Sequence, residues 1–562
     1  MKSLLRITGV TLVMVLVFAS CKKSVPKQVR FIPKDASFVI GINPKNLNGK
    51  LAKSNISLDS LFKSALADNA DANDVQKWDD LKNSGINFQS DVYAFVQIKG
   101  SIMSGSSTTL GAVAALDDAT KFEAYIKKQK PGITVQKANG FSFATIQNSL
   151  AIGWSGDIVV LAGNPNTHSM LDTTANATAG AAQQQQVLAD IFALKEEASV
   201  ASIAEFRDLT ATKADALLWT NSSNTLNTAI PMIAMTKASD LMKDSYGAGF
   251  VNFEDGKVAG EFKYYANKAF GDILKKYAGP TVDMGMVDQY PSANIDGFGV
   301  FSFNPQLITA IVQFIGLDAT ANSYLNSSMG FTLDDVTKAF KGDFAIIASD
   351  AGEKEVTSPY NPALTYKQST VKYLFNARVG DKAAYTKVTA ALAAKGVLVA
   401  NAGGYTISPV PGIAASIDDK NVLVASDSAL LLDYKAGKGK ATLAADVKDK
   451  VKGSATAMYF DIAKIMTGFT PAPADTTKTA IHQLALKTFR DAYFASDNYD
   501  GKAMKSIFEM RTVNEKENSL ASIVKFSAGS ARLAKIEEKK ANADALITAP
   551  VDTVAAPAVP AH

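Results

Sequence analysis

The sequence of 562 residues predicts an α+β fold made of two tandem homologous halves, each a mainly antiparallel sheet with packed helices. Three observations predict it: an internal repeat, strand patterns joined by turns too short for parallel crossovers, and helical patterns between runs of strands. The composition, 47% apolar and 20% charged, is typical of a globular protein with a large core. We expect the halves at residues 29–278 and 279–533, followed by a helical end and a disordered Ala/Pro tail at 534–562.

The repeat begins at two strand patterns that each end in Asn-Pro and pass into a helix start. Asn43 and Asn304 occupy these positions and are 261 residues apart. Further pairs of segments follow in the same order, with looser matches towards the end of each half. The pairs are 38–47 with 299–308, 90–98 with 342–350, 114–128 with 376–390, 151–164 with 414–427, 214–223 with 455–464, and 249–265 with 506–526.

Each half is predicted to run strand, helices, two strands, helix, four strands, helix, strand and a closing hairpin. Residues 141–163 alternate apolar and polar side chains, with turn residues at 148–149 and 155–157, as in consecutive hairpins. Asp118 and Asp381 each precede a helical pattern. A short carboxylate there accepts free backbone N–H groups, so both are predicted to be N-caps.

The N-terminus has the order of an export signal: Lys2 and Arg6, an uncharged apolar run, then small residues before Cys21. The run is too short to span a bilayer, which takes about 20 apolar residues. The stretch Phe18-Ala19-Ser20-Cys21 resembles the bacterial lipobox, although Phe18 stands where that pattern prefers Leu. We therefore expect residues 1–20 to be a lipoprotein signal peptide and Cys21 to carry lipid, with an ordinary cleaved signal as the alternative.

Residues 21–28 are expected to be a lipidated tether. Lys22 and Lys23 can be attracted to anionic headgroups, and no acidic residue follows the cysteine. Surface-exported lipoproteins of Bacteroidota tend to carry acidic residues there, so the periplasmic face of the outer membrane is the expected location. Without residues 1–20 the chain has a net charge of +2, which argues against a nucleic-acid partner.

No catalytic constellation emerges from the sequence. The three histidines, His168, His482 and His562, are isolated, and His482 is expected to be a half-buried core residue. The serine-hydrolase elbow, the H-E-x-x-H zinc motif and the Walker phosphate loop are absent from the sequence. Ser60 to Lys63 and Ser496 to Asn498 match two of three penicillin-binding motifs but lie far apart in the chain. We predict no catalytic residues.

Cofactor and metal sites are not predicted either. The acidic run at 68–74 lacks the central Gly and terminal Glu of a calcium loop, so it is expected to be a solvated linker. The single cysteine excludes disulfides and thiolate metal sites. In the repeat, Trp154 aligns with Ile417 and Trp219 with Tyr459. Because large apolar residues share these positions, the tryptophans are expected in the core rather than on a glycan-binding surface.

The segment at 29–51, especially Ile32-Pro33-Lys34-Asp35-Ala36 leading into an alternating strand, resembles the Bacteroidota lipoproteins of domain of unknown function 4836. The resemblance extends over most of the chain after the cysteine. It implies a Gram-negative envelope lipoprotein and brings no assigned activity or catalytic residue.

The functional expectation is a non-enzymatic outer-membrane lipoprotein that binds or scaffolds another envelope component, anchored through lipid on Cys21. Two alternatives stay open. One is a binder of small ligands or glycans in a groove between the halves. The other is a hydrolase that uses only carboxylates, which two Asp or Glu side chains can achieve in glycosidases.

Overall fold

A computed structural model describes most of the chain. No helix within the described ranges is both long and apolar enough to cross a membrane. The described residues are 25–57, 59–60, 72–101, 105–147, 149–164, 180–223, 237–358, 360–408, 410–471 and 475–548.

The first half follows the predicted order of elements, after a short 3₁₀ helix, η1 (Lys27–Phe31). Its strands are β1 (Phe38–Ile42), β2 (Val92–Ser101), β3 (Gly105–Ala115), β4 (Gln136–Ala138), β5 (Phe141–Gln147), β6 (Leu150–Ser155), β7 (Ile158–Gly163), β8 (Ala216–Asn221), β9 (Tyr246–Glu254) and β10 (Lys257–Tyr265). Its helices are α2 (Pro44–Lys53), α4 (Ala72–Lys82), α5 (Ala119–Gln129), α6 (Gly180–Phe192), α7 (Ala204–Thr210), α9 (Ala238–Met242) and α10 (Lys268–Lys276).

The second half has the corresponding strands in the same sequence. They are β11 (Ile295–Ser302), β12 (Phe340–Thr357), β13 (Thr365–Val379), β14 (Leu398–Asn401), β15 (Gly404–Ile407), β16 (Ala414–Ile417), β17 (Asn421–Ala425), β18 (Thr456–Phe460), β19 (Phe489–Ser496) and β20 (Met504–Thr512). The helices are α11 (Gly285–Asp288), α12 (Gln306–Phe314), α13 (Asp318–Met329), α14 (Leu333–Ala339), α15 (Lys382–Ala394), α16 (Ser428–Lys435), α17 (Ala445–Val451), α18 (Ile462–Gly468), α19 (Thr476–Thr488) and α20 (Ser519–Thr548).

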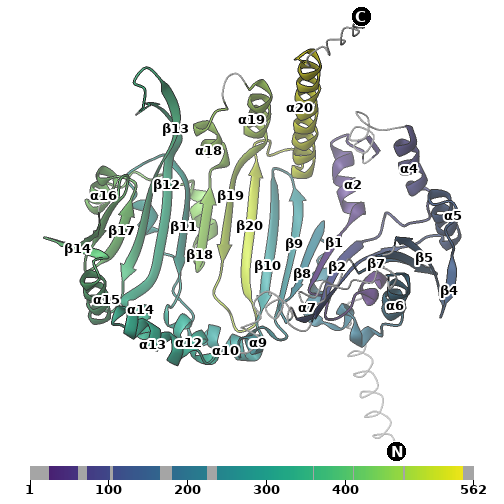
Figure 1. Cartoon of the computed structure of the whole chain (residues 1–562), viewed down its shortest axis with the longest axis horizontal. Helices are drawn as coiled ribbons and strands as arrows, with labels where there is room; N and C mark the ends of the chain where they lie inside the picture. The colour runs from purple at the N-terminus through teal and green to yellow at the C-terminus, as the bar shows by residue number, and fades with distance from the viewer. Residues whose placement is uncertain are drawn as a thin grey trace, which may run out of the picture.

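All described strand pairs are antiparallel and join into one wide sheet, which Figure 1 shows edge to edge. The order in the first half is β4-β5-β6-β7-β3-β2-β1-β8-β9-β10. The second half repeats it as β14-β15-β16-β17-β13-β12-β11-β18-β19-β20. The α+β class and the antiparallel pairing are therefore as predicted.

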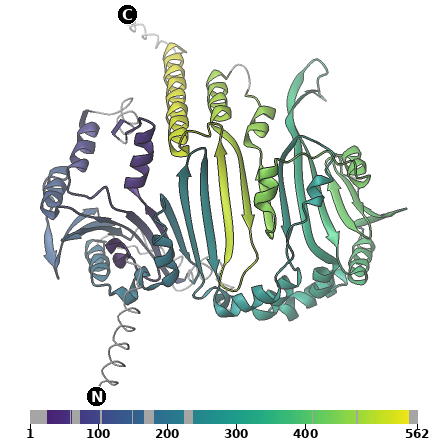
Figure 2. The ribbon, with the colours of Figure 1, turned by 180° about the vertical axis from the view of Figure 1, so that it is seen from behind.

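The two halves meet through their last strands. β10 pairs antiparallel with β20, from Lys257 opposite Arg511 to Tyr264 opposite Met504. This pairing makes the sheet continuous across the chain, so the halves lie side by side in one layer. In Figures 1 and 2, α9, α10, α12, α13 and α14 lie along one long side of the sheet, and α18, α19 and α20 lie along the other.

One face of the sheet carries the two main cores. In the first half, side chains such as Val39, Tyr93 and Trp219 pack with η1, α6 and α7. In the second half, residues such as Val300 and Ile347 pack with α11, α16 and α17. Smaller clusters place α5 on β5 to β7, and α14 and α15 on the outer strands of the second half. We call the opposite surface of the strands from β3 to β13 the open face.

The predicted helix caps are confirmed. The Asp118 carboxylate accepts hydrogen bonds from the N–H groups of Thr120 and Lys121, and the Asp381 carboxylate accepts one from Ala384. Asn43 caps α2 by accepting from the N–H of Asn46, with Pro44 in the first helical position. Local side-chain chemistry thus sets where these helices begin.

The predicted match of 249–265 with 506–526 is wrong, because it sets β9 against β20, whereas the repeated strand order makes β20 the counterpart of β10. The closing hairpin of the second half is β19 with β20, and α20 begins at Ser519. Leu520, Ile523 and Val524 have the i, i+3, i+4 spacing of a helix, and the Asn518 side chain accepts the N–H of Leu520. α20 therefore runs continuously through the boundary expected between residues 533 and 534.

The folded body also begins earlier than the predicted tether ends. Gln28 lies in η1, is buried, and donates a side-chain hydrogen bond to the carbonyl of Asp91 at 3.0 Å. Val29 is fully buried beside it. Residues 27 and 28 of the expected tether thus belong to the folded body, with Gln28 buried and Lys27 exposed. Residues 1–24 and 549–562 lie outside the described residues.

Candidate binding site

The open face is apolar along its length. Six large apolar side chains on it are between 38% and 51% exposed: Ile40, Ile42, Leu110, Ile346, Phe460 and Phe508. Residues directly opposite in antiparallel strands point to the same side of a sheet. The register places Ile42, Phe508 and Ile346 in one cross-strand row, with Phe494 and Met458 between the last two. Ile40, Leu110 and Phe460 lie on the same face in neighbouring rows.

The apolar row is long because the sheet is continuous. Leu110 on β3 and Ile346 on β12 are ten strand positions apart, which at about 4.8 Å per strand is about 48 Å. Between them each strand is paired on both sides, so its backbone N–H and C=O groups are engaged in the ladders. The open face therefore presents mainly carbon to its surroundings.

An apolar cavity of about 460 Å³ lies on this face in the second half, where α18 packs against β11, β12 and β19. The floor comes from β11, β12 and β18, and the wall from Ile465 of α18 and Phe469 just after it. Ile346 and Phe460 belong both to the lining and to the exposed row. A second hollow of about 350 Å³ adjoins it and shares Phe301 and Ile346.

The lining of the larger cavity offers no accessible polar atom. Asp296 is its single charged residue and is 3% exposed. Its Oδ2 accepts the N–H of Ala351 at 2.6 Å, and burial raises the pKa of its carboxyl group. Asp296 thus fixes the end of β11 against β12, and the cavity wall remains apolar.

Glycines give the cavity its depth. Gly297 and Gly299 occupy open-face positions of β11, whereas the open-face positions of β1 carry Phe38, Ile40 and Ile42. A Cβ at Gly297 would lie 2.8 Å from the Tyr459 carbonyl oxygen and 3.1 Å from the Phe460 ring. The hollow is consequently a feature of the second half, although the strand order is common to both.

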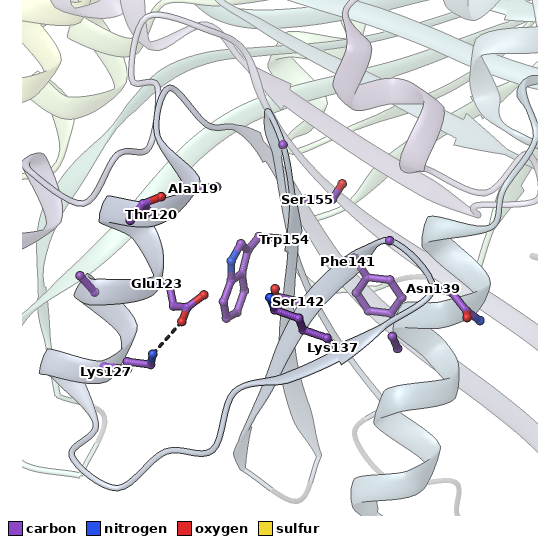
Figure 3. Close-up of a pocket in the computed structure, with 14 residues that line it drawn as sticks. Ala119, Thr120, Glu123, Lys127, Lys137, Asn139, Phe141, Ser142, Trp154 and Ser155 are labelled. Carbon is purple, nitrogen blue, oxygen red and sulfur yellow. Dashed lines mark hydrogen bonds and ion pairs between the residues drawn. The ribbon is translucent and has the colours of Figure 1, made fainter.

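A cavity of different character, about 690 Å³, lies in the first half between α5, the β4–β5 turn and the end of β6 (Figure 3). Its charged side chains include Glu123 and Lys127, which pair at 2.6 Å. Trp154 stands between α5 and β5 but is only 3% exposed, and its ring meets Phe122 edge-on at 5.5 Å. Trp154 therefore attaches α5 to the sheet and offers no stacking platform.

The structure agrees with the core assignment of the aromatic residues. Trp154, Trp219, Ile417 and Tyr459 are all buried. His482 is half-buried and its Nε2 lies 2.7 Å from the Met466 carbonyl oxygen, as expected of a core histidine. Asn498 exchanges two hydrogen bonds with the backbone of Gly279, which is a structural role at the junction of the halves.

Several predicted features lie outside the described residues: Cys21, Lys63, His168, His562 and the acidic residues 68–71. Ser60 is described and forms a local turn with Ser57. Within the described ranges, no group of three or more His, Cys, Asp or Glu side chains is placed to hold a metal ion.

At the junction between the halves, where the alternative function placed a groove, β10 and β20 are hydrogen-bonded neighbours. Each of the three cavities described above is lined by one half alone. The open face was not predicted from the sequence, although the composition of two strands indicates it. In "FVIGI" (38–42) and in 297–301, apolar or glycine residues occupy both alternating positions, which indicates strands with two apolar faces.

A family model matches part of the chain. Residues 29–280 match the family model "Domain of unknown function (DUF4836)", which covers the first half rather than most of the chain. No curated protein matches. Two solved structures of TP0453 are similar to this chain. Crystal form IV has 8% sequence identity and a TM-score of 0.24, and the match covers 43% of this chain and 81% of TP0453. Crystal form III has 7% identity and a TM-score of 0.25, and the match covers 47% of this chain and 91% of TP0453. Because these TM-scores are below 0.5, the similarity supports no conclusion about fold or function.

Proposed function

We propose that this protein is a non-enzymatic lipoprotein of the bacterial envelope, anchored by lipid on Cys21 to the periplasmic face of the outer membrane, and that it binds another envelope component on the open face. The observation that carries the proposal is the row of exposed apolar side chains from Leu110 to Ile346. Leaving such surface in water costs about 25 cal/mol per Å², and large exposed apolar patches mark interaction sites.

The proposal also includes the lipid anchor on Cys21 and the origin of the two halves by duplication. The charged, apolar and small-residue order before Cys21 supports export and lipidation. The repeated strand order, together with a family match that ends at residue 280, supports a duplication of one α+β unit. A duplicated unit explains how so wide a sheet arises from a domain of ordinary size.

The test places a photo-crosslinking residue beside Phe508, at the centre of the row, in the full-length anchored protein in intact cells. We expect one dominant partner, whose capture falls at least tenfold with Phe508→Asp. A carboxylate buried at an interface without a counter-charge costs several kcal/mol, and each 1.4 kcal/mol is a factor of ten in affinity.

The matched control is Leu432→Asp. Leu432 is 65% exposed, but it lies on α16, outside the open face. Capture that survives Leu432→Asp and is lost in both Phe508→Asp and the mislocalised Cys21→Ala variant would support the proposal. Equal capture by all four proteins would refute it.

Small-ligand binding is the second candidate function. The apolar cavity beside α18 favours it and moves the expected ligand site from the junction between the halves to the second half. A carboxylate hydrolase finds no support in this cavity, because none of its accessible lining atoms is polar.

A further inference from the structure

We propose that the cavity between α18 and the sheet binds the acyl chain of a lipid, an inference that rests on the proposed binding function and names the ligand for one part of the open face. The site is the 460 Å³ cavity, with its mouth at Ile346 and Phe460. Both of these side chains are about half exposed, so the cavity opens directly onto the surface.

The absence of accessible polar atoms from the cavity lining indicates which kind of ligand can bind there. A peptide segment brings an N–H and a C=O group with every residue, and each must find a partner when it is buried. The cavity has no accessible polar atom to provide one, and the neighbouring strands already use their backbone groups in the ladders. A saturated alkyl chain is the common biological group that fills such a space without an unpaired donor or acceptor.

The size and shape fit the same ligand. An apolar protein cavity of about 150 Å³ holds a benzene ring, so 460 Å³ has room for on the order of a dozen alkyl carbons. The adjoining hollow is lined by Phe303, Phe344 and Phe375 and continues the path across β11, β12 and β13. A chain longer than the cavity would therefore run out along these rings, while its headgroup stays in water at the mouth.

The experiment titrates saturated fatty acids of 8 to 16 carbons into the chain from Lys22 to His562, which retains every residue that the structure describes. Calorimetry is expected to show saturable binding that tightens about fourfold with each added methylene until the chain fills the cavity. Beyond that length the affinity is expected to level off. Absence of saturable binding, or affinity independent of chain length, would overturn the inference.

Two variants change the cavity in opposite directions. Ala348→Phe puts a ring into the space and is expected to weaken dodecanoate binding at least tenfold, whereas Ile465→Ala removes part of the wall and should move the levelling-off point to longer chains. Ala94→Phe is the matched control, because Ala94 lies on the open face of β2 in the first half, away from the cavity. Its binding should equal that of the unchanged protein.

The outcomes separate this inference from the proposed function. Partner capture that depends on Phe508, together with no fatty-acid binding, would overturn the acyl-chain site and leave the proposed function standing. Fatty-acid binding that Ala348→Phe leaves unchanged would also overturn the site. Binding lost in Ala348→Phe and retained in Ala94→Phe, with both variants unfolding at the temperature of the unchanged protein, would support it.

Discussion

Arg511→Ala is expected to lower the free energy of unfolding by about 3–5 kcal/mol, because it removes the guanidinium bound to both oxygens of the buried Asp491 carboxylate and leaves only Arg490 Nε, at 3.6 Å. Arg511 is buried on β20, beside the seam between the halves. Its Nε and Nη2 donate to the two carboxylate oxygens of Asp491 at 2.5 and 2.7 Å, and Nη1 donates to Asp446. Urea denaturation followed by circular dichroism measures the loss.

The control removes an ion pair of the same charge type from the surface. Lys268 and Asp272 pair at 2.7 Å with side chains 89% and 67% exposed, so Lys268→Ala should cost less than about 1 kcal/mol. Combining Arg511→Met with Asp491→Leu should recover part of the loss, since no unpaired buried charge remains at Asp491. Equal effects of Arg511→Ala and Lys268→Ala would contradict the explanation.

Trp219→Ala is expected to destabilise the protein by about 3–5 kcal/mol, as large-to-small replacements of buried aromatic residues do. Trp219 is fully buried on β8, stacks on Tyr246 at 4.9 Å and meets Phe206 edge-on at 5.3 Å. Its removal opens a cavity at the centre of the first core. The shift of the urea midpoint, converted with an unchanged slope, gives the cost.

Trp219→Phe separates packing from hydrogen bonding. The indole N–H of Trp219 has no hydrogen-bond partner among the described residues, so a phenyl ring loses volume but no polar contact. We expect a clearly smaller cost than that of Trp219→Ala, because the phenyl ring leaves a smaller cavity. A loss as large as that of the alanine variant would show that the contacts of the indole ring, and not aromatic packing in general, stabilise this core.

Local chemistry made much of the fold predictable. Asp118 and Asp381 cap helices because a short carboxylate before a helical pattern has unpaired N–H groups within reach. The hairpins from β5 to β7 follow from alternation and turn residues. The error at α20 arose because Leu520 to Phe526 is short and apolar, and such a run is compatible with either a strand or a helix until its packing is known.

The sheet-wide open face was beyond sequence reasoning for a different reason. The sequence of a strand shows which of its residues are apolar, but it does not show which other strand will pair with it, because that depends on residues far away in the chain. The pairing of β10 with β20 aligns Phe262 and Phe508 on one side of the sheet, although they are 246 residues apart in the chain. The cavity beside α18 likewise depends on where that helix packs against the strands, and the sequence of residues 462–468 alone does not specify this position.

The seam between β10 and β20 has a consequence for the ancestry of the chain. Pairing two equivalent strands antiparallel relates the halves by an approximate two-fold axis, as in a symmetric homodimer. A single half would expose the nine-residue edge of β10, a template for another copy, whereas the intact sheet ends in β4 and β14, with three and four residues. On the duplication proposed above, gene fusion turned an association that depends on concentration into a permanent one and left only short edges exposed.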